Sequence, residues 1–416
     1  MNIFERIESN VRSYSRSFPA VFTRAKMSKM YDENGREYLD FFDGAGALNY
    51  GHNNDFIKRR IIEYIESDGI SHALDMFTQA KREFFSCFEE KILKPRGLDY
   101  KIMSCAPTGT NAVEAALKLA RKYTGRQGVF ALTGSFHGMT LGSLSVTSGK
   151  TVRRGAGEPL INTTFVPHPN SFRGDSIAYI EDLITNEYSG VEKPAAIIIE
   201  TVQAEGGVIV AGEDWLRELR ALCDRQGVLL IVDDIQVGCG RTGKFFSFER
   251  AGIVPDMVTL SKSISGYGLP MSLLLLRPEL DVFNPGEHNG TFRGNQMAFV
   301  GAKAAIEYRE QVGLEEKTLR SAKIISDFVE ERILPLNDKL QHRGLGMIQG
   351  IDFRFAQGER DIAGEVAHEC FRNGLIIERS GPNDCVLKIM PALTIEEDEL
   401  MAGLEIIEAA VKKYLK

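Results

Sequence analysis

The strongest constraint on the fold is an alternation of strand-like and helix-like segments between residues 100 and 290. The strand-like runs are short, apolar and rich in β-branched residues. They occupy 101–105, 128–133, 195–201, 228–232, 257–260 and 271–276, and helical runs at 111–124 and 215–225 lie between them. Parallel strands need long crossover connections, which are usually helices, so we expect an α/β fold with a mainly parallel sheet covered by helices on both faces.

The rest of the chain predicts a smaller α+β unit. A long helical stretch at 296–333, broken near Gly313, is followed by a β-rich piece at 346–353 and by helices at 363–372 and 396–414. Asn34-Gly35 between two short apolar stretches indicates a hairpin, and 55–68 and 78–92 show helical spacing. We expect an N-terminal segment (1–55) that contributes to the small domain, a large domain (56–295) and a C-terminal small domain (296–416).

Charge and composition exclude several classes of partner. The formal net charge is -7, which argues against nucleic acids and anionic membranes as main partners. The longest apolar runs are far too short to span a bilayer, and the N-terminus lacks the apolar core of a signal peptide. The six cysteines have no metal-ligand spacing, so we expect reduced thiols, no metal site and a cytoplasmic protein.

Chemically useful residues follow several of the predicted strands. Pro107 to Asn111 lies between a strand and a helix, where Gly109 allows close approach to a ligand and Thr110 supplies a hydroxyl. Together with the free N–H groups of a helix start, these residues suit a phosphate, although an ordinary helix cap has the same composition. After the next strand, Phe136 is placed to stack on a flat cofactor, or is simply a half-buried loop residue.

An aspartate directly after a buried strand needs a cationic partner, because burial of an unpaired carboxylate is costly. Asp233 has this position, and a protonated pyridine nitrogen would be such a partner. Ile235 is then placed to pack on the ring face and Gln236 to reach a ring hydroxyl. The alternative interpretation of Asp233 is a helix N-cap.

Lys262 follows the apolar strand 257–260 and precedes a loop with Gly266. Desolvation at such a place lowers the pKa of a lysine and lets it act as nucleophile and proton carrier. A surface lysine is the ordinary alternative. A phosphate cup, a stacking ring, a ring-nitrogen carboxylate and this lysine, in this order, are together an improbable accident.

These motifs resemble the class III (subgroup II) aminotransferases, which use pyridoxal 5′-phosphate (PLP). The resemblance covers nearly the whole chain and implies fold type I, with a seven-stranded sheet in the large domain. It also implies that Lys262 holds PLP as a Schiff base and that Asp233 keeps the ring protonated. The expected cofactor-binding residues are Gly109, Thr110, Phe136, His137, Asp233, Ile235, Gln236, Lys262 and Thr291.

The stretch Gly290 to Asn295 carries a further implication. In the family, the threonine that matches Thr291 reaches the cofactor phosphate of the partner subunit. The resemblance therefore implies a homodimer with shared active sites.

The stretches Phe41 to His52 and Gly286 to Asn295 resemble a narrower branch, the diaminobutyrate–2-oxoglutarate aminotransferases of ectoine biosynthesis. The implied reaction converts L-glutamate and L-aspartate 4-semialdehyde to 2-oxoglutarate and L-2,4-diaminobutyrate by a ping-pong route. Asn49, Glu205 and Lys388 are the expected substrate-binding residues. Relatives carry a carboxylate-binding arginine where this chain has Lys388, and a lysine cannot make the bidentate fork.

Other interpretations remain open at this stage. The chain also fits an ornithine- or 4-aminobutyrate-type aminotransferase, a 1,2-aminomutase, or a PLP-binding protein without catalysis. Diaminobutyrate, if it is the product, supplies ectoine synthesis in one interpretation and a siderophore or peptide antibiotic in another.

Overall fold

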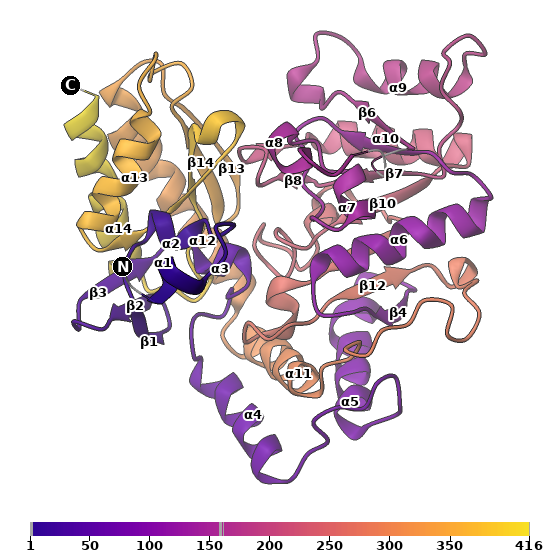
Figure 1. The fold of residues 1–416 in the computed structure, drawn as a ribbon, viewed down its shortest axis with the longest axis horizontal. Helices are drawn as coiled ribbons and strands as arrows, with labels where there is room; N and C mark the ends of the chain where they lie inside the picture. Colours follow the sequence, from indigo (N-terminus) through magenta and orange to yellow (C-terminus); the bar gives the residue numbers. More distant parts are fainter. Residues whose placement is uncertain (1–2, 158–159, 161, 416) are drawn as a thin grey trace.

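The computed structural model describes residues 3–157, 160 and 162–415. A seven-stranded sheet forms the centre of the larger body (Figure 1), in the order β4-β12-β11-β10-β7-β5-β6. Its strands are β4 (Lys101–Ser104), β5 (Val129–Leu132), β6 (Thr163–Val166), β7 (Ala196–Ile199), β10 (Leu229–Asp233), β11 (Met257–Leu260) and β12 (Leu273–Leu276). Only β12 runs antiparallel to its neighbours, so the predicted mainly parallel sheet is confirmed.

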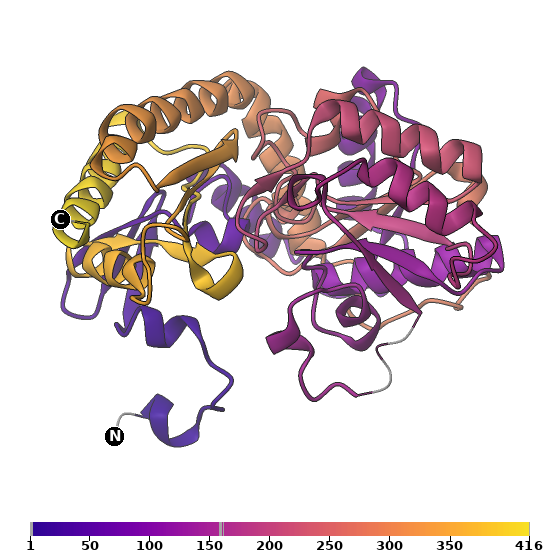
Figure 2. The same cartoon turned by 90° about the horizontal axis from the view of Figure 1, so that it is seen from above.

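Helices cover both faces of this sheet (Figure 2), which explains why its central strands are apolar on both sides. Every residue of β7 is fully buried. Helix α6 (Gly109–Thr124) packs on one face, while α9 (Ser176–Thr185) and α10 (Glu213–Gln226) lie on the other. Helix α6 ends at Gly125, whose φ of 70° is the left-handed conformation that favours glycine at a C-terminus.

Further helices complete the larger body. They are α4 (Asp55–Glu66), α5 (Gln79–Phe88), α7 (Leu141–Ser145), α8 (Lys150–Arg153) and α11 (Gln296–Gln311), with a π-helical turn η1 (Glu89–Leu93) after α5. Helix α11 packs against both α4 and α5. A small ribbon of β8 (Val202–Gln203) and β9 (Ile209–Val210) follows β7.

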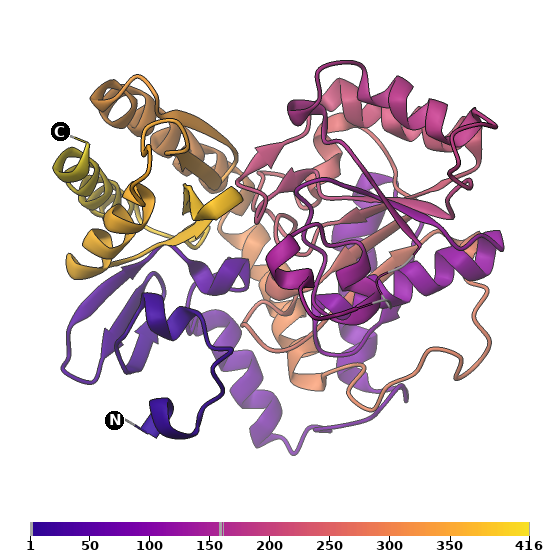
Figure 3. The ribbon, with the colours of Figure 1, turned by 45° about the horizontal axis from the view of Figure 1, so that its top comes forward.

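The smaller body combines the two ends of the chain (Figure 3). Its first sheet joins β1 (Phe22–Lys26), β2 (Lys29–Asp32), β3 (Glu37–Asp40) and β15 (Leu375–Ile376); its second joins β13 (Gln341–Leu345), β14 (Ile348–Asp352), β17 (Val386–Ile389) and β16 (Glu378–Ser380). Helices α12 (Leu314–Phe328), α13 (Ile362–Arg372) and α14 (Glu397–Tyr414) pack around them. Short helices α1 (Ile3–Ile7), α2 (Tyr14–Ser17) and α3 (Asp43–Gly46) belong to the N-terminal segment. The pairing of β3 with β15 agrees with an N-terminal segment that joins the small domain, although the limits at 55 and 295 stay a prediction.

Two predictions near glycines have different outcomes. The break near Gly313 is confirmed, because this residue separates α11 from α12 with a φ of 57°. The predicted strand at 346–353 is wrong at its start, because Gly346 is in the turn between β13 and β14. Its φ of 59° is a left-handed value, so the backbone turns where a strand was expected. A Cβ at this position would lie 2.4 Å from the carbonyl oxygen of Arg241, so the turn requires glycine. Within the described residues, no helix is both long and apolar enough to cross a bilayer.

The segment Asp43 to Gly46 adopts an unusual left-handed turn. All four residues have positive φ, including Asp43 at 55° and Ala45 at 57°. Such a conformation costs roughly 1–2 kcal/mol for each residue with a side chain, so the surrounding structure has to hold it in place. Ser263 does so from the other body, since its hydroxyl donates a 2.8 Å hydrogen bond to the carbonyl of Gly46.

Arg241 fastens the same turn and is fully buried. Its guanidinium forms an ion pair with Asp43, donates a 2.7 Å hydrogen bond to the Asn49 side chain, and also donates to the carbonyl groups of Met347 and Pro391. The Arg241 guanidinium therefore joins three parts of the chain that are far apart in sequence. Because a buried charge is stable only when it is paired, each of these partners depends on the others.

We predict that Arg241→Met destabilises the protein by about 3–5 kcal/mol, because it leaves the carboxylate of Asp43 buried without its cation. Denaturant unfolding monitored by circular dichroism measures the change. Arg320→Met, at an exposed position on α12, is the matched control and should shift stability by less than about 0.5 kcal/mol. Equal stability of the two variants would contradict the role given to Arg241.

Candidate active site

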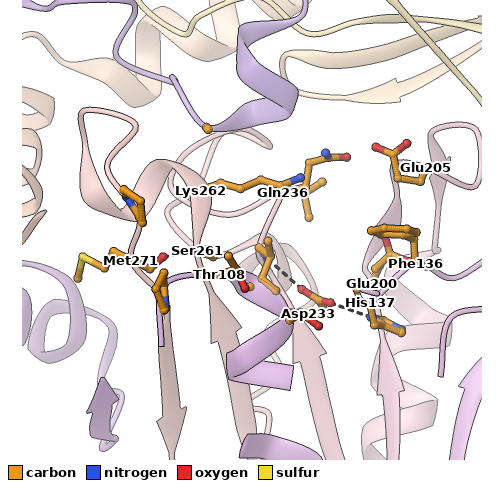
Figure 4. Close-up of a pocket in the computed structure, with 18 of the residues that line it drawn as sticks. Thr108, Phe136, His137, Glu200, Glu205, Asp233, Gln236, Ser261, Lys262 and Met271 are labelled. Carbon is orange, nitrogen blue, oxygen red and sulfur yellow. Dashed lines mark hydrogen bonds and ion pairs between the residues drawn. The ribbon is translucent and has the colours of Figure 1, made fainter. Parts of the chain in front are cut away.

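A cavity of about 380 Å³ lies at the carboxyl ends of the central strands (Figure 4). It is the position where open α/β sheets bind ligands. Nine of the residues expected at the site line it: Gly109, Thr110, Phe136, His137, Glu205, Asp233, Ile235, Gln236 and Lys262. Ala47, directly after the left-handed turn, contributes from the smaller body. Both bodies therefore contribute to one cavity.

The first residues of α6 form one wall of this cavity. Thr108 caps the helix, with a hydroxyl that donates a 2.8 Å hydrogen bond to the Asn111 side chain. The first N–H groups of a helix have no partner within it, so they are available to an anion in the cavity. Gly109 is required here, since a Cβ would come within 2.8 Å of the Ile235 side chain. The hydroxyl of Thr110 lies 2.7 Å from that of Thr140.

Asp233 and His137 form a buried pair on the cavity wall. An Asp233 carboxylate oxygen, Oδ2, lies 2.7 Å from Nδ1 of His137, while Oδ1 accepts hydrogen bonds from the Ile235 N–H at 3.1 Å and the Thr259 hydroxyl at 3.2 Å. Burial acts to lower the pKa of His137, but the hydrogen bond to Asp233 outweighs it and raises this pKa. The carboxylate is thus fixed in direction by three donors and faces the cavity.

Glu200 lies in the same wall and was not predicted. Its carboxylate accepts a 3.0 Å hydrogen bond from the Phe136 N–H and so positions the ring that was expected to stack on a cofactor. Burial raises the pKa of Glu200 to about 8, against the opposing effect of His137. The signal was present in the sequence, because Glu200 follows β7 in the way that Asp233 ends β10.

Lys262 lies just after β11, at the start of a short 3-10 turn (Lys262–Ser265). Its φ of 52° is a left-handed value that is rare for a residue with a long side chain. This backbone turns the side chain into the cavity, towards Gln236 (Figure 4). Burial lowers the pKa of Lys262, and the nearby Lys388 adds to that effect. The structure thus presents a desolvated amine opposite the Asp233 carboxylate.

An ion cluster lies behind the cavity wall at Glu205. Nζ of Lys388 lies 2.7 Å from Glu205 and 2.8 Å from Glu378, and its side chain is 0% exposed. Glu378 also accepts a 3.0 Å hydrogen bond from the Tyr14 hydroxyl. Sequence analysis named neither Glu378 nor Tyr14 as a site residue, because the two come together only through tertiary packing.

Three expected site residues lie outside the cavity lining. Lys388 is behind Glu205, and Asn49 is buried with its side chain used by Arg241 and by the Cys239 carbonyl. Thr291 is exposed on the loop between β12 and α11. The predicted substrate contacts of Asn49 and Lys388 and the cofactor contact of Thr291 stay predictions.

A sequence model of the class III aminotransferase family matches residues 11–411. The chain belongs to the class III aminotransferases. Its relatives include the diaminobutyrate–2-oxoglutarate transaminase of Streptomyces avermitilis, 53% identical over 418 residues, with 99% of this chain and 98% of the relative covered. The enzyme of the same description from Halalkalibacterium halodurans is 52% identical over 419 residues, with 100% and 97% covered.

Solved structures of aminotransferases share the fold. An ornithine aminotransferase from Toxoplasma gondii aligns with a TM-score of 0.86 at 23% identity, covering 99% of this chain and 93% of the other. An aminotransferase from Bacillus anthracis aligns with a TM-score of 0.86, also at 23% identity, covering 99% and 97%. These likenesses confirm the expected fold type I.

The cofactor of this aminotransferase is PLP, and the cavity fits it. The α6 start would hold the phosphate, Phe136 and Ile235 would enclose the ring, and Asp233 would pair with the ring nitrogen. The Gln236 side-chain oxygen is buried without a hydrogen-bond partner, as expected of a group that awaits a ligand. Among the described residues, we find no cluster of three histidine, cysteine or acidic side chains able to hold a metal ion.

We predict that borohydride reduction fixes PLP covalently to Lys262 and to no other lysine, because among the lysines that the structure describes Lys262 alone lines the cavity. Peptide mass spectrometry of the reduced protein measures the added mass. In the Lys262→Ala protein the cofactor should wash out after reduction, whereas Lys323→Ala, at an exposed lysine, should retain it. A labelled peptide without Lys262 would refute the assignment.

Proposed function

We propose that this aminotransferase moves the amino group of L-glutamate to the terminal carbon of L-aspartate 4-semialdehyde, giving L-2,4-diaminobutyrate and 2-oxoglutarate. The observation that carries the proposal is the placement of the Lys262 amine and the Glu205 carboxylate in one cavity, within a chain 53% identical to an enzyme of that description. We further propose that the protein is cytoplasmic and that its product feeds ectoine biosynthesis.

Lys262 is the proposed proton carrier. Its lowered pKa leaves more of the amine neutral, so Nζ can take the proton from the α-carbon of glutamate. PLP supplies an electron sink for the pair released at that carbon. Asp233, oriented by His137, stabilises the positive ring nitrogen on which that sink depends.

The walls of the cavity fix the substrate and keep water out. Phe136, held by Glu200, covers one side, and Ala47 closes the cavity from the smaller body. The transfer needs access to an α-amine in one half-reaction and to a terminal amine in the other. Both half-reactions use the same Lys262. The two substrates therefore have to differ in how they bind at the other end of the cavity, near Glu205.

We predict that L-2,4-diaminobutyrate and L-glutamate both convert the cofactor absorbance of the pure protein to that of the aminated cofactor, and that 2-oxoglutarate restores it. Stopped-flow spectra measure both half-reactions, with ornithine and 4-aminobutyrate as comparison substrates. A response to ornithine or 4-aminobutyrate but none to diaminobutyrate would overturn the proposed substrate. Turnover without any keto-acid acceptor would indicate an aminomutase instead.

We also propose that the protein acts as a homodimer, with Thr291 of the partner subunit completing each cavity. An exposed apolar patch supports this proposal: Phe77 is 100% exposed, Phe292 is 66% exposed, and Leu74 and Met76 are exposed beside them. The His72 and Phe292 rings are 5.4 Å apart, which brings the segment before α5 next to the loop of Thr291. Such a patch on a water-soluble enzyme is typical of a protein interface.

Mixed dimers test this arrangement. A dimer of one Lys262→Ala chain and one Thr291→Ala chain contains one native cavity if Thr291 acts across the interface, and none if it acts within its own chain. We predict that co-expressed, differently tagged chains, purified as the mixed dimer, recover about half of the wild-type activity per dimer. Activity no higher than that of either parent homodimer would contradict the shared site.

A further inference from the structure

The Lys388 cluster holds two carboxylates against one ammonium. Strand pairing creates this excess, because Glu378 on β16 is directly opposite Lys388 on β17 in the antiparallel ladder. Glu205 approaches from the other body, after β8. A single arginine or lysine facing one glutamate would form a neutral pair, whereas here Glu205 has to share the ammonium with Glu378.

The two carboxylates differ in exposure. The Glu205 side chain is 31% exposed and lines the cavity, while the Glu378 side chain is 8% exposed and lies behind it. Oε2 of Glu378 is 2.8 Å from Nζ of Lys388, and Oε1 of Glu205 is 2.7 Å from the same nitrogen. The ammonium is thus divided between the two partners, and its charge does not fully neutralise the carboxylate that faces the substrate.

Resting on the proposed function, we propose that Glu378 is a specificity-determining residue: through Lys388 it leaves Glu205 negatively charged towards the cavity, where Glu205 binds the α-ammonium group of diaminobutyrate. The cavity therefore selects an ω-amino acid with a second cationic group over one that lacks it. Glu205 contacts the substrate, and Glu378 and Lys388 are positioning residues.

The ionisation of the cluster agrees with this division. Burial acts to raise the pKa of Glu205, but Lys388 and Lys262 outweigh it and lower this pKa, so Glu205 keeps its charge. Burial also raises the pKa of Glu378, and Lys388 opposes this rise, so one ammonium acts on both carboxylates.

Two amino acids isolate the proposed contact. L-2,4-diaminobutyrate and 4-aminobutyrate have the same carboxylate and the same terminal amine, and they differ only in the α-ammonium. For each, the dissociation constant and the rate of the half-reaction come from the cofactor absorbance of the holoenzyme. The shift in thermal unfolding midpoint with each amino acid gives a second readout that does not depend on turnover.

In the wild-type protein we expect a clear preference for diaminobutyrate. In Glu378→Gln this preference should fall by about tenfold or more, the loss expected for one hydrogen bond to a charged group, mainly through weaker diaminobutyrate binding. Glu378→Asp should restore part of it. Glu205→Gln, at a half-exposed side chain that the fold tolerates, should lower the preference at least as much. Glu396→Gln, at an exposed glutamate paired with Lys317, is the matched control and should leave it unchanged.

The outcomes separate this inference from the proposed function. A wild-type protein that does not react with diaminobutyrate would overturn both. A wild-type protein that reacts, with Glu378→Gln and Glu205→Gln variants that keep the full preference, would overturn the inference alone. An equal loss for both amino acids in Glu378→Gln would show that the cluster only holds the sheet together, and would also overturn it.

Discussion

A carboxylate buried at the end of a central strand carries a large desolvation cost, and Asp233 is such a carboxylate. Within the sheet, the Thr259 hydroxyl donates a hydrogen bond to this carboxylate but brings no positive charge. The compensation comes from His137 on one side and from the cation that a bound ring would place on the other. The loops after neighbouring strands are arranged around this requirement, since Phe136, Gly109 and Lys262 all face the space in front of Asp233. The reactive amine is therefore opposite a fixed negative charge.

The smaller body contributes a segment with a strained backbone to the cavity. The left-handed turn at Asp43 to Gly46 places Ala47 over the cavity and is held by Arg241 and Ser263 from the larger body. Conformations of this kind persist only where surrounding contacts over-determine them, and they are frequent at functional sites. Because Arg241 also binds the carbonyl groups of Met347 and Pro391, the same buried cation links the closing segment to the C-terminal strands. The buried Arg241 therefore connects the segment over the cavity to the packing of the smaller body.

The sequence predicts the central sheet and the cofactor wall well, because both arise from local patterns. Short apolar runs followed by Gly109, Phe136, Asp233 and Lys262 place these residues at one edge of a parallel sheet. The edge strand β6 was not predicted, because two of its four residues are threonines and only Val166 is fully buried, so it lacks the apolar run of the central strands. Glu378 and Tyr14 escaped because they are 364 residues apart and meet only through tertiary packing. Lys388 and Glu205 were identified by resemblance, but the second partner of Lys388, Glu378, is placed by strand register, which no local pattern reveals.

The central claim is that this site transfers nitrogen from the α-position of glutamate to a terminal carbon. The most direct measurement supplies ¹⁵N-labelled L-glutamate and unlabelled L-aspartate 4-semialdehyde to the holoenzyme and locates the label in the product by NMR. The account predicts diaminobutyrate with ¹⁵N at the C4 nitrogen and none at the C2 nitrogen. Label at C2, or the absence of labelled diaminobutyrate while glutamate is consumed, would contradict it.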